Sequence, residues 1–218
     1  MTHRGFKDKL YPEFARVAQA VASDRRLELV DLLAQAPRRV EALADETGMT
    51  VANVSQHLQV LKNARLVESG RRGTMVTSRL ASPGVLSLWL ALRGVAEDRL
   101  PEIGKLREEF SSHGEEVPRK ELQSLLKRGK AVLVDVRPGI EFASGHIRGA
   151  MPIPIEDLEK HLKELPRDKR IVAYCRGAYC LFADEAVALL RKRGFDAVRL
   201  EGGWPEWTAE GRPVAAGS

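Results

Sequence analysis

The sequence predicts two domains, a mainly α-helical domain followed by an α/β domain with a parallel sheet. A length of 218 residues suits two small domains. Apolar residues of the first half recur at three- and four-residue steps, whereas short β-branched runs alternate with helical stretches in the second half. A polar run containing Gly and Pro separates the two patterns. We expect a first domain over 1–112, a linker over 113–117 and a second domain over 118–218.

Composition excludes several classes of protein. Hydrophobic residues make up 44% of the chain, but the longest apolar stretch, Val85 to Leu92, is far shorter than the ~20 residues of a transmembrane helix. The N-terminus has no apolar signal region, so we expect a cytoplasmic protein with no membrane partner. Two cysteines are too few for a disulfide framework. The net charge of +5 is compatible with a polyanionic partner and does not require one.

The segment from Arg39 to Leu66 is predicted to fold as two helices joined by a turn. Gly48 supplies the turn, and Thr50 is a favourable N-cap for a helix running from Val51 to Asn63. Apolar residues at helical spacing predict a buried stripe on this helix, formed by Val51, Val54, Leu58 and Leu61.

The opposite face of this helix carries side chains that suit contact with double-stranded DNA. Asn and Gln can form bidentate contacts with adenine, and Ser or His can reach bases or phosphates. The candidate DNA-binding residues are Asn53, Ser55, Gln56, His57 and Gln59. The alternative is a polar face that only contacts solvent.

A β-hairpin is predicted directly after this helix. Its first strand is Leu66–Glu68, its turn is Ser69–Gly73, and its second strand is Thr74–Leu80. Arg71 and Arg72 at the tip suit contact with phosphates or the minor groove.

The run TVANVSQHLQVLKNARLVESGRRGTMVTSRLA resembles the ArsR-type winged helix-turn-helix repressors, and the resemblance covers about residues 10–110. It implies a homodimer that binds an operator in double-stranded DNA. Arg65 stands where the family usually has Gly, so the turn must adopt another conformation or be strained. Apolar residues after the hairpin supply either the dimer interface or the core of the domain: Leu86, Trp89, Leu90, Leu92 and Val95.

Many members of this family sense metals through cysteine-containing sites. The first half of this chain contains no cysteine, so the thiolate ligands that suit soft metals are absent. We therefore expect no metal site and no cofactor, and a signal must come from elsewhere.

In the second half, Cys175 ends a buried strand, and a short loop leads from it into a helix predicted over Tyr179–Arg193. Backbone N–H groups of such a loop and the helix dipole lower the pKa of a thiol, so we expect a thiolate at neutral pH. The loop, which can bind the anionic part of a substrate, consists of Arg176, Gly177, Ala178 and Tyr179.

Three blocks, VLVDVRPGIEFASGHIRGAMPIP, IVAYCRGAYC and LEGGWPEWTAEGRPV, resemble the rhodanese domain over about 117–215. This resemblance implies an α/β sulfurtransferase in which Cys175 is the catalytic carrier. Its thiolate takes the outer sulfur of thiosulfate or another small sulfane-sulfur donor, and the resulting persulfide passes that sulfur to a thiol acceptor.

The loop departs from the family pattern at three positions. Leu181 occupies the place where related phosphatases and arsenate reductases need Arg, which argues against phosphatase chemistry. Ala178 stands where many rhodaneses have Gly, so thiosulfate turnover is in question. Cys180 is a second candidate catalytic thiol, able to attack a persulfide and release sulfide, or else a small apolar residue packed in the first turn of the helix.

The other motif residues are expected to support the loops. Asp135, Arg137, Glu141 and His146 are predicted to form one buried polar network. Gly202, Gly203 and Trp204 are predicted to shape the rim of the site. Arg148 and Arg176 either attract an anionic donor or face solvent.

Together these features predict a DNA-binding repressor whose rhodanese domain accepts sulfane sulfur and signals it to the DNA-binding domain. One alternative is a sulfurtransferase whose DNA-binding domain only localises it or regulates its own operon. A second alternative is an oxidative sensor that forms a Cys175–Cys180 disulfide.

Overall fold

The computed structural model describes residues 3–73, 75–110 and 114–216. The chain divides into two compact units, Met1–Ala91 and Leu92–Ser218. Residue 113, where the predicted linker begins, lies outside the described residues, and the boundary at 113–117 stays a prediction. No helix in the described ranges is long and apolar enough to cross a membrane.

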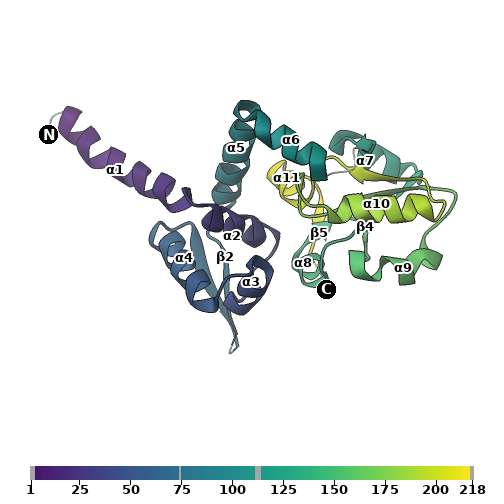
Figure 1. Ribbon diagram of the computed structural model, residues 1–218, viewed down its shortest axis with the longest axis horizontal. Helices are drawn as coiled ribbons and strands as arrows, with labels where there is room; N and C mark the ends of the chain where they lie inside the picture. The colour runs from purple at the N-terminus through teal and green to yellow at the C-terminus, as the bar shows by residue number, and fades with distance from the viewer. Residues whose placement is uncertain (1–2, 74, 111–113, 217–218) are drawn as a thin grey trace. The chain divides into compact units, whose positions relative to one another are not determined.

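The first unit is mainly helical, as predicted (Figure 1). Its core contains buried residues from α2, α3 and α4, among them Leu29, Leu43 and Leu61. Its elements in chain order are α1 (His3–Val21), α2 (Asp24–Gln35), α3 (Val40–Thr47), α4 (Val51–Asn63), β1 (Val67–Arg72), β2 (Met75–Leu80) and the start of α5 (Pro83–Arg99).

Helices α3 and α4 form the predicted helix-turn-helix. Gly48 ends α3 in the left-handed conformation with φ 65°, and the Thr50 side chain accepts a hydrogen bond from the Asn53 N–H at 3.2 Å. The predicted stripe is buried at Val54, Leu58 and Leu61. The prediction was wrong for Val51, which is 45% exposed. This residue is the first of α4 and lies beyond the edge of the core.

The hairpin is present, but the predicted turn at Ser69–Gly73 was wrong. Strand β1 continues to Arg72, because Ser69 and Gly70 pair with Ser78 and Thr77 in the antiparallel ladder, and the last pair joins Arg72 to Met75. Gly73 follows with φ 61°. Thr74, which was placed in the second strand, lies outside the described residues.

The base of the hairpin is attached to the helical core through Arg38. Its backbone N–H donates to the Ser78 carbonyl at 2.9 Å, and the Ser78 N–H donates back at 2.7 Å. The Arg38 side chain is 3% exposed and lies 2.5 Å from a carboxylate oxygen of Glu46 on α3. This contact fixes the hairpin relative to the helix-turn-helix.

Trp89 on α5 belongs to the core of the first unit. It packs against the buried cluster, and its indole N–H donates to Asp31 at 2.9 Å. Leu86 and Leu90 are half-buried, whereas Leu92 and Val95 are exposed. Trp89 therefore belongs to the core of the domain and not to a dimer interface. For the other four apolar residues, a role in the dimer interface stays a prediction.

The second unit is an α/β domain around a five-stranded parallel sheet, as predicted (Figure 1). The strand order is β3 (Glu116–Val117), β8 (Ala197–Leu200), β7 (Arg170–Tyr174), β4 (Ala131–Asp135) and β6 (Ala150–Pro152). A separate antiparallel pair consists of β5 (His146–Ile147) and β9 (Val214–Ala215). The helices are α6 (Pro101–Phe110), α7 (Arg119–Lys127), α8 (Gly139–Ser144), α9 (Leu158–His161), α10 (Phe182–Lys192) and α11 (Trp204–Ala209).

Alternate residues of the central strands enter two different cores. Val134 and Ala173 pack with α10 on one face of the sheet, whereas Leu133, Val172 and Tyr174 pack with α7 and α11 on the other. Strands buried on both faces are typical of parallel sheets and explain the continuous apolar runs in the sequence. The carboxyl end of β7 leads directly into Cys175.

Arg65 adopts a left-handed backbone conformation with φ 58°, so of the two alternatives that the sequence left open, strain is the one that applies. An L-residue in this region costs about 1–2 kcal/mol, whereas glycine has no such cost but loses more entropy on folding. We expect Arg65→Gly to raise the free energy of unfolding by about 0.5–1 kcal/mol, measured by urea denaturation. Arg65→Ala is the matched control, because it removes the side chain and keeps the strain. An equal gain in both variants would contradict backbone strain as the cause.

Candidate functional sites

The predicted DNA-contacting residues lie on the accessible side of α4. Asn53, Ser55, Gln56 and Gln59 are exposed, and His57 is half-buried. The Gln59 amide N–H donates to Asn63 at 2.7 Å, within the last turns of the helix. Polar, exposed side chains on one helix face are therefore available to a DNA groove.

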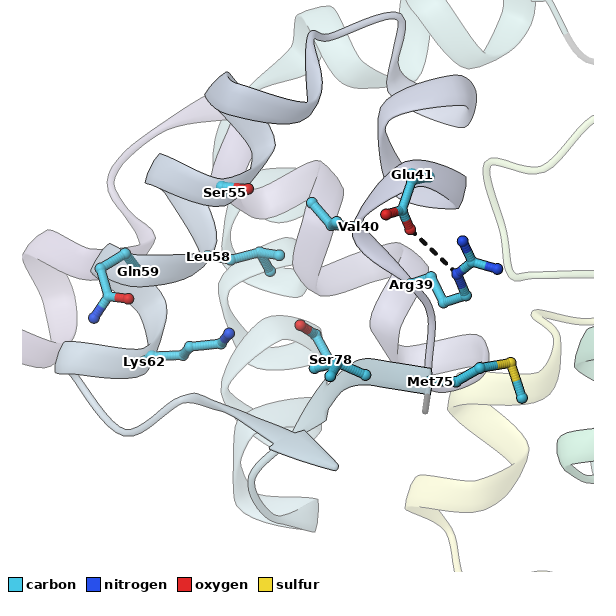
Figure 2. Close-up of a pocket in the computed structure, with 10 residues that line it drawn as sticks. Arg39, Val40, Glu41, Ser55, Leu58, Gln59, Lys62, Met75 and Ser78 are labelled. Carbon is cyan, nitrogen blue, oxygen red and sulfur yellow. Dashed lines mark hydrogen bonds and ion pairs between the residues drawn. The ribbon is translucent and has the colours of Figure 1, made fainter. Parts of the chain in front are cut away.

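A pocket with a volume of about 570 Å³ lies beside α4. Figure 2 shows Ser55, Gln59 and Lys62 on α4, with Arg39 at the start of α3 and Met75 on β2. Lys62 adds positive charge that was not assigned to DNA binding from the sequence, whereas Arg39 is paired with Glu41 at 3.2 Å. Basic residues next to the polar face of the predicted helix could have indicated these positions in the sequence, because phosphates are bound by cationic side chains.

Of the two basic residues at the hairpin tip, Arg71 is exposed, and its Nε donates to the Gly73 carbonyl at 3.0 Å. For Arg72 only the backbone, which ends β1, is described.

In the second unit, Cys175 lies at the start of the loop that joins β7 to α10. Its side chain is buried, and its Sγ lies 3.3 Å from the carbonyl oxygen of Cys180. Backbone N–H groups of Gly177 and Ala183 donate to the Cys175 sulfur. Gly177 has φ 146°, a conformation that favours glycine. The loop therefore places carbonyl acceptors at Gly177 and Cys180 as well as backbone donors around the sulfur, and α10 begins at Phe182 rather than at residue 179.

The expectation of a Cys175 thiolate was wrong for this geometry. Burial raises the pKa of Cys175 well above its ordinary value, and a hydrogen bond to Cys180 raises it further, which outweighs the backbone donors. The hydrogen bond from the Cys175 thiol instead lowers the pKa of Cys180 to about 7, assisted by backbone donors and by Arg176. Cys180, which is partly exposed, is therefore the more acidic thiol of the pair.

Gly203 closes the loop from the opposite side. A Cβ at this position would lie 2.4 Å from the Cys175 carbonyl oxygen and 2.5 Å from the Gly177 nitrogen, so no side chain fits without backbone movement. The next residue, Trp204, donates its backbone N–H to the Cys175 carbonyl at 3.1 Å. The Gly-Gly-Trp motif thus holds the loop by direct backbone contact.

A buried ion pair supports this arrangement. Arg137 and Asp135 are both 0% exposed and approach to 2.7 Å, and the Arg137 guanidinium also donates to the Gly145 carbonyl at 2.8 Å. The Tyr174 hydroxyl donates to the same carboxylate at 2.5 Å. The Arg137 guanidinium lies 4.8 Å from the ring centroid of Trp204. The network therefore connects β4, β7 and the Gly-Gly-Trp motif.

Glu141 and His146, which the sequence assigned to this same network, have other partners. Glu141 is 0% exposed and lies 2.6 Å from the Arg176 guanidinium in the loop. His146 stacks on Phe142 with ring centroids 3.7 Å apart. Arg148 donates to the Val214 carbonyl at 3.4 Å. Arg176 is therefore an anchor of the loop whose charge is compensated by Glu141.

The loop also contacts the end of α5, which was not predicted from the sequence. The Tyr179 hydroxyl donates to Glu97 at 2.7 Å, and the Arg93 guanidinium lies 5.7 Å from the Tyr179 ring centroid. Arg93 also forms an ion pair with Glu206 on α11. Burial and the Glu97 carboxylate raise the pKa of Tyr179 to about 12, so this hydroxyl remains a donor at neutral pH. No local sequence signal links positions so far apart.

Comparison with known proteins agrees with both halves. The model of the bacterial regulatory protein arsR family matches residues 23–69, and the model of the rhodanese-like domain matches residues 118–210. An HTH-type transcriptional regulator of Mycobacterium tuberculosis is 42% identical over 213 residues, which cover 97% of this chain and 94% of that protein. The chain belongs to the arsR-type transcriptional regulators that carry a rhodanese-like domain.

Two other relatives match one half of this regulator each. A sulfurtransferase of Allochromatium vinosum is 33% identical over 95 residues, which cover 43% of this chain and 87% of that protein. The solution structure of a homodimeric winged helix-turn-helix domain of Mycobacterium bovis, a possible ArsR-family regulator, has 42% identity and a TM-score of 0.43. It covers 46% of this chain and 91% of that one.

The unequal thiols of this regulator predict unequal reactivity. Iodoacetamide reacts with thiolates, so alkylation of Cys180 should rise with pH through about 7 and level off above it. Cys175 should react more slowly at neutral pH, because burial raises its pKa and keeps it protonated in the resting protein. Peptide mass spectrometry over pH 5–9 measures both rates. Faster alkylation of Cys175 than of Cys180 would contradict this order.

Proposed function

We propose that this regulator accepts sulfane sulfur on the cysteine pair of its rhodanese-like domain and thereby changes the affinity of its DNA-binding half for an operator. The observation that carries the proposal is the placement of both cysteines in one loop, where the Cys175 Sγ lies 3.3 Å from the Cys180 carbonyl oxygen and the two thiols shift each other's pKa. Two neighbouring thiols, one of them with a pKa near neutral, can take up a sulfur atom and then release it as sulfide.

The uptake step uses a hydropersulfide or another sulfane donor, written R–S–SH. Cys175 passes its proton to the Cys180 thiolate, and its own thiolate attacks the outer sulfur of the donor. A bond forms between Cys175 Sγ and that sulfur, the S–S bond of the donor breaks, and R–S⁻ leaves with the electron pair. The Gly177 and Ala183 N–H groups are placed to stabilise the resulting Cys175 persulfide.

The second step uses Cys180 as the acceptor thiol. After losing its proton to water, the Cys180 thiolate attacks Cys175 Sγ, the persulfide S–S bond breaks, and HS⁻ leaves. The product is a Cys175–Cys180 disulfide. A loop that contains a disulfide has a different conformation from a loop that contains two thiols. This conformational difference is the proposed signal.

The side chains of the DNA-binding half suit binding to an operator in double-stranded DNA. Exposed polar side chains on α4 suit contacts with a groove, and Lys62 and Arg71 suit contacts with phosphates. We infer that the regulator works as a homodimer, and the exposed apolar side chains Leu92 and Val95 on α5 are available to a second copy. A cytoplasmic location fits this function and stays a prediction.

Helix α5 provides a physical route for the signal. Val85 near its start is buried in the core of the first unit, whereas Glu97 near its end accepts the hydrogen bond from Tyr179 in the thiol loop. Tyr179 lies between the two cysteines in the chain. A change in the loop therefore acts on a helix that also contributes to the DNA-binding half.

The deciding experiment measures binding to DNA from the upstream region of the gene, at one fixed salt concentration, before and after polysulfide treatment. We expect an affinity change of about 5–150-fold, the range of typical couplings, and no change in Cys175→Ser. Intact mass detects the persulfide intermediate by its added sulfur, and release of sulfide distinguishes its conversion to the disulfide from direct oxidation of the two thiols. Equal binding in both states would favour a sulfurtransferase with no sensing role, and a response to peroxide alone would favour an oxidative sensor.

Tyr179→Phe tests the route through α5. It removes one hydroxyl and its hydrogen bond to Glu97 and leaves both cysteines in place. We expect persulfide formation at the wild-type rate and at least a threefold smaller change in DNA affinity on sulfur uptake. Tyr11→Phe, which removes a hydroxyl from the exposed Tyr11 of α1, is the matched control. A change in DNA affinity on sulfur uptake as large in Tyr179→Phe as in wild type would exclude this hydrogen bond as the route.

A further inference from the structure

A cavity of about 350 Å³ lies between α6 and the thiol loop. Helix α6 contributes the apolar side chains Ile103, Leu106 and Phe110, together with Arg107. From the loop, Ala178 and Tyr179 lie between the two cysteines in sequence, and Leu181 directly follows Cys180. Any molecule bound in this cavity is therefore held against the segment that carries both thiols.

Leu181 gives the cavity part of its apolar character. This is the position at which an arginine would be needed to clamp an oxyanion, and here it presents a hydrocarbon side chain to the cavity. Leu106 is 55% exposed and Phe110 is 67% exposed, although both lie beside this cavity. Exposed large apolar side chains gathered around a hollow are typical of a surface that binds an apolar group.

The charges around the loop do not favour a small dianion such as thiosulfate. Arg176 is paired with Glu141 at 2.6 Å, and Arg107 is paired with Glu116 at 3.0 Å. Likewise, Arg93 pairs with Glu206 and Glu97, and Arg199 pairs with Asp184 at 2.7 Å. Each of these four arginines is compensated by a carboxylate. A dianion would have to compete with those carboxylates, whereas an apolar donor with at most one charge would not.

We propose that this cavity binds the organic group of the sulfur donor, and that the donor is a hydropersulfide with an aromatic or branched aliphatic group. The inference rests on the proposed sulfur uptake and adds the class of donor. The volume is sufficient, because an engineered apolar cavity of about 150 Å³ holds benzene. The bound donor places its terminal sulfur at the loop and its apolar group against α6, and R–SH leaves by the same opening.

The test compares benzyl hydropersulfide with glutathione hydropersulfide and with thiosulfate as donors to the reduced full chain. Intact-mass analysis follows the second-order rate of sulfur addition. We expect benzyl hydropersulfide to react at least ten times faster than either polar donor, because a fitting apolar group typically favours one substrate over another by about 10–200-fold. Equal rates for the benzyl and glutathione donors would overturn the assignment.

Leu106→Ser removes an apolar wall of the cavity at an exposed position, so the fold is expected to persist. We expect the benzyl rate to fall at least fivefold and the glutathione rate to stay unchanged. Leu100→Ser is the matched control, because Leu100 is 50% exposed and does not line the cavity. An equal loss with both donors, or an equal loss in both variants, would overturn the proposal.

Binding without chemistry separates this inference from the proposed function. Benzyl methyl sulfide has no transferable sulfur, and its binding is measured by calorimetry. Binding to wild type and loss of binding in Leu106→Ser would support the cavity even where no persulfide forms, in which case only the proposed sulfur uptake fails. No binding to wild type overturns the cavity as a ligand site. A changed oligomeric state of Leu106→Ser in sedimentation would also overturn it, since a second copy would then cover α6.

Discussion

The thiol loop depends on the buried ion pair between Arg137 and Asp135. Further hydrogen bonds offset the cost of burying such a pair, and here Tyr174 donates to Asp135 and the Gly145 carbonyl accepts from Arg137, although Arg137 Nη1 is buried without a hydrogen-bond partner among the described residues. Tyr174 is the last residue of β7, so the pair fixes the strand end from which Cys175 continues. The Arg137 guanidinium also lies against Trp204, whose backbone holds the loop from the other side. The position of the sulfur is therefore set by a network that does not touch it.

Burial has opposite effects on the two cysteines. Cys175 lies under the loop, where loss of solvent disfavours the thiolate, and Cys180 lies nearer the surface, where it accepts the hydrogen bond of Cys175. The proton is thus held between two sulfurs instead of being lost to water. This arrangement links the reactivity of a partly exposed thiol to a buried one that backbone N–H groups surround.

The second constraint is charge compensation around the loop. Arginines are frequent near the thiols, yet those at positions 93, 107, 176 and 199 each face a carboxylate. Their role in this structure is to hold elements together: Arg176 joins the loop to α8, and Arg93 joins α5 to α11. The apolar cavity beside α6 is the feature that we propose for substrate recognition, and its α6 wall lies outside residues 118–210, which the rhodanese-like family model matches.

The two fold classes, the helix-turn-helix with its hairpin, an unusual turn at Arg65 and the loop that contains both cysteines could all be predicted from the sequence. These features are local, because periodicity, caps and turn residues act over a few positions. Only the tertiary structure decided that Val51 is exposed, that Glu141 pairs with Arg176, and that Cys180 rather than Cys175 has the lower pKa. It also brought Tyr179 to Glu97 and α6 to the loop. Burial and pairing depend on residues distant in the chain, and packing alone brings these together.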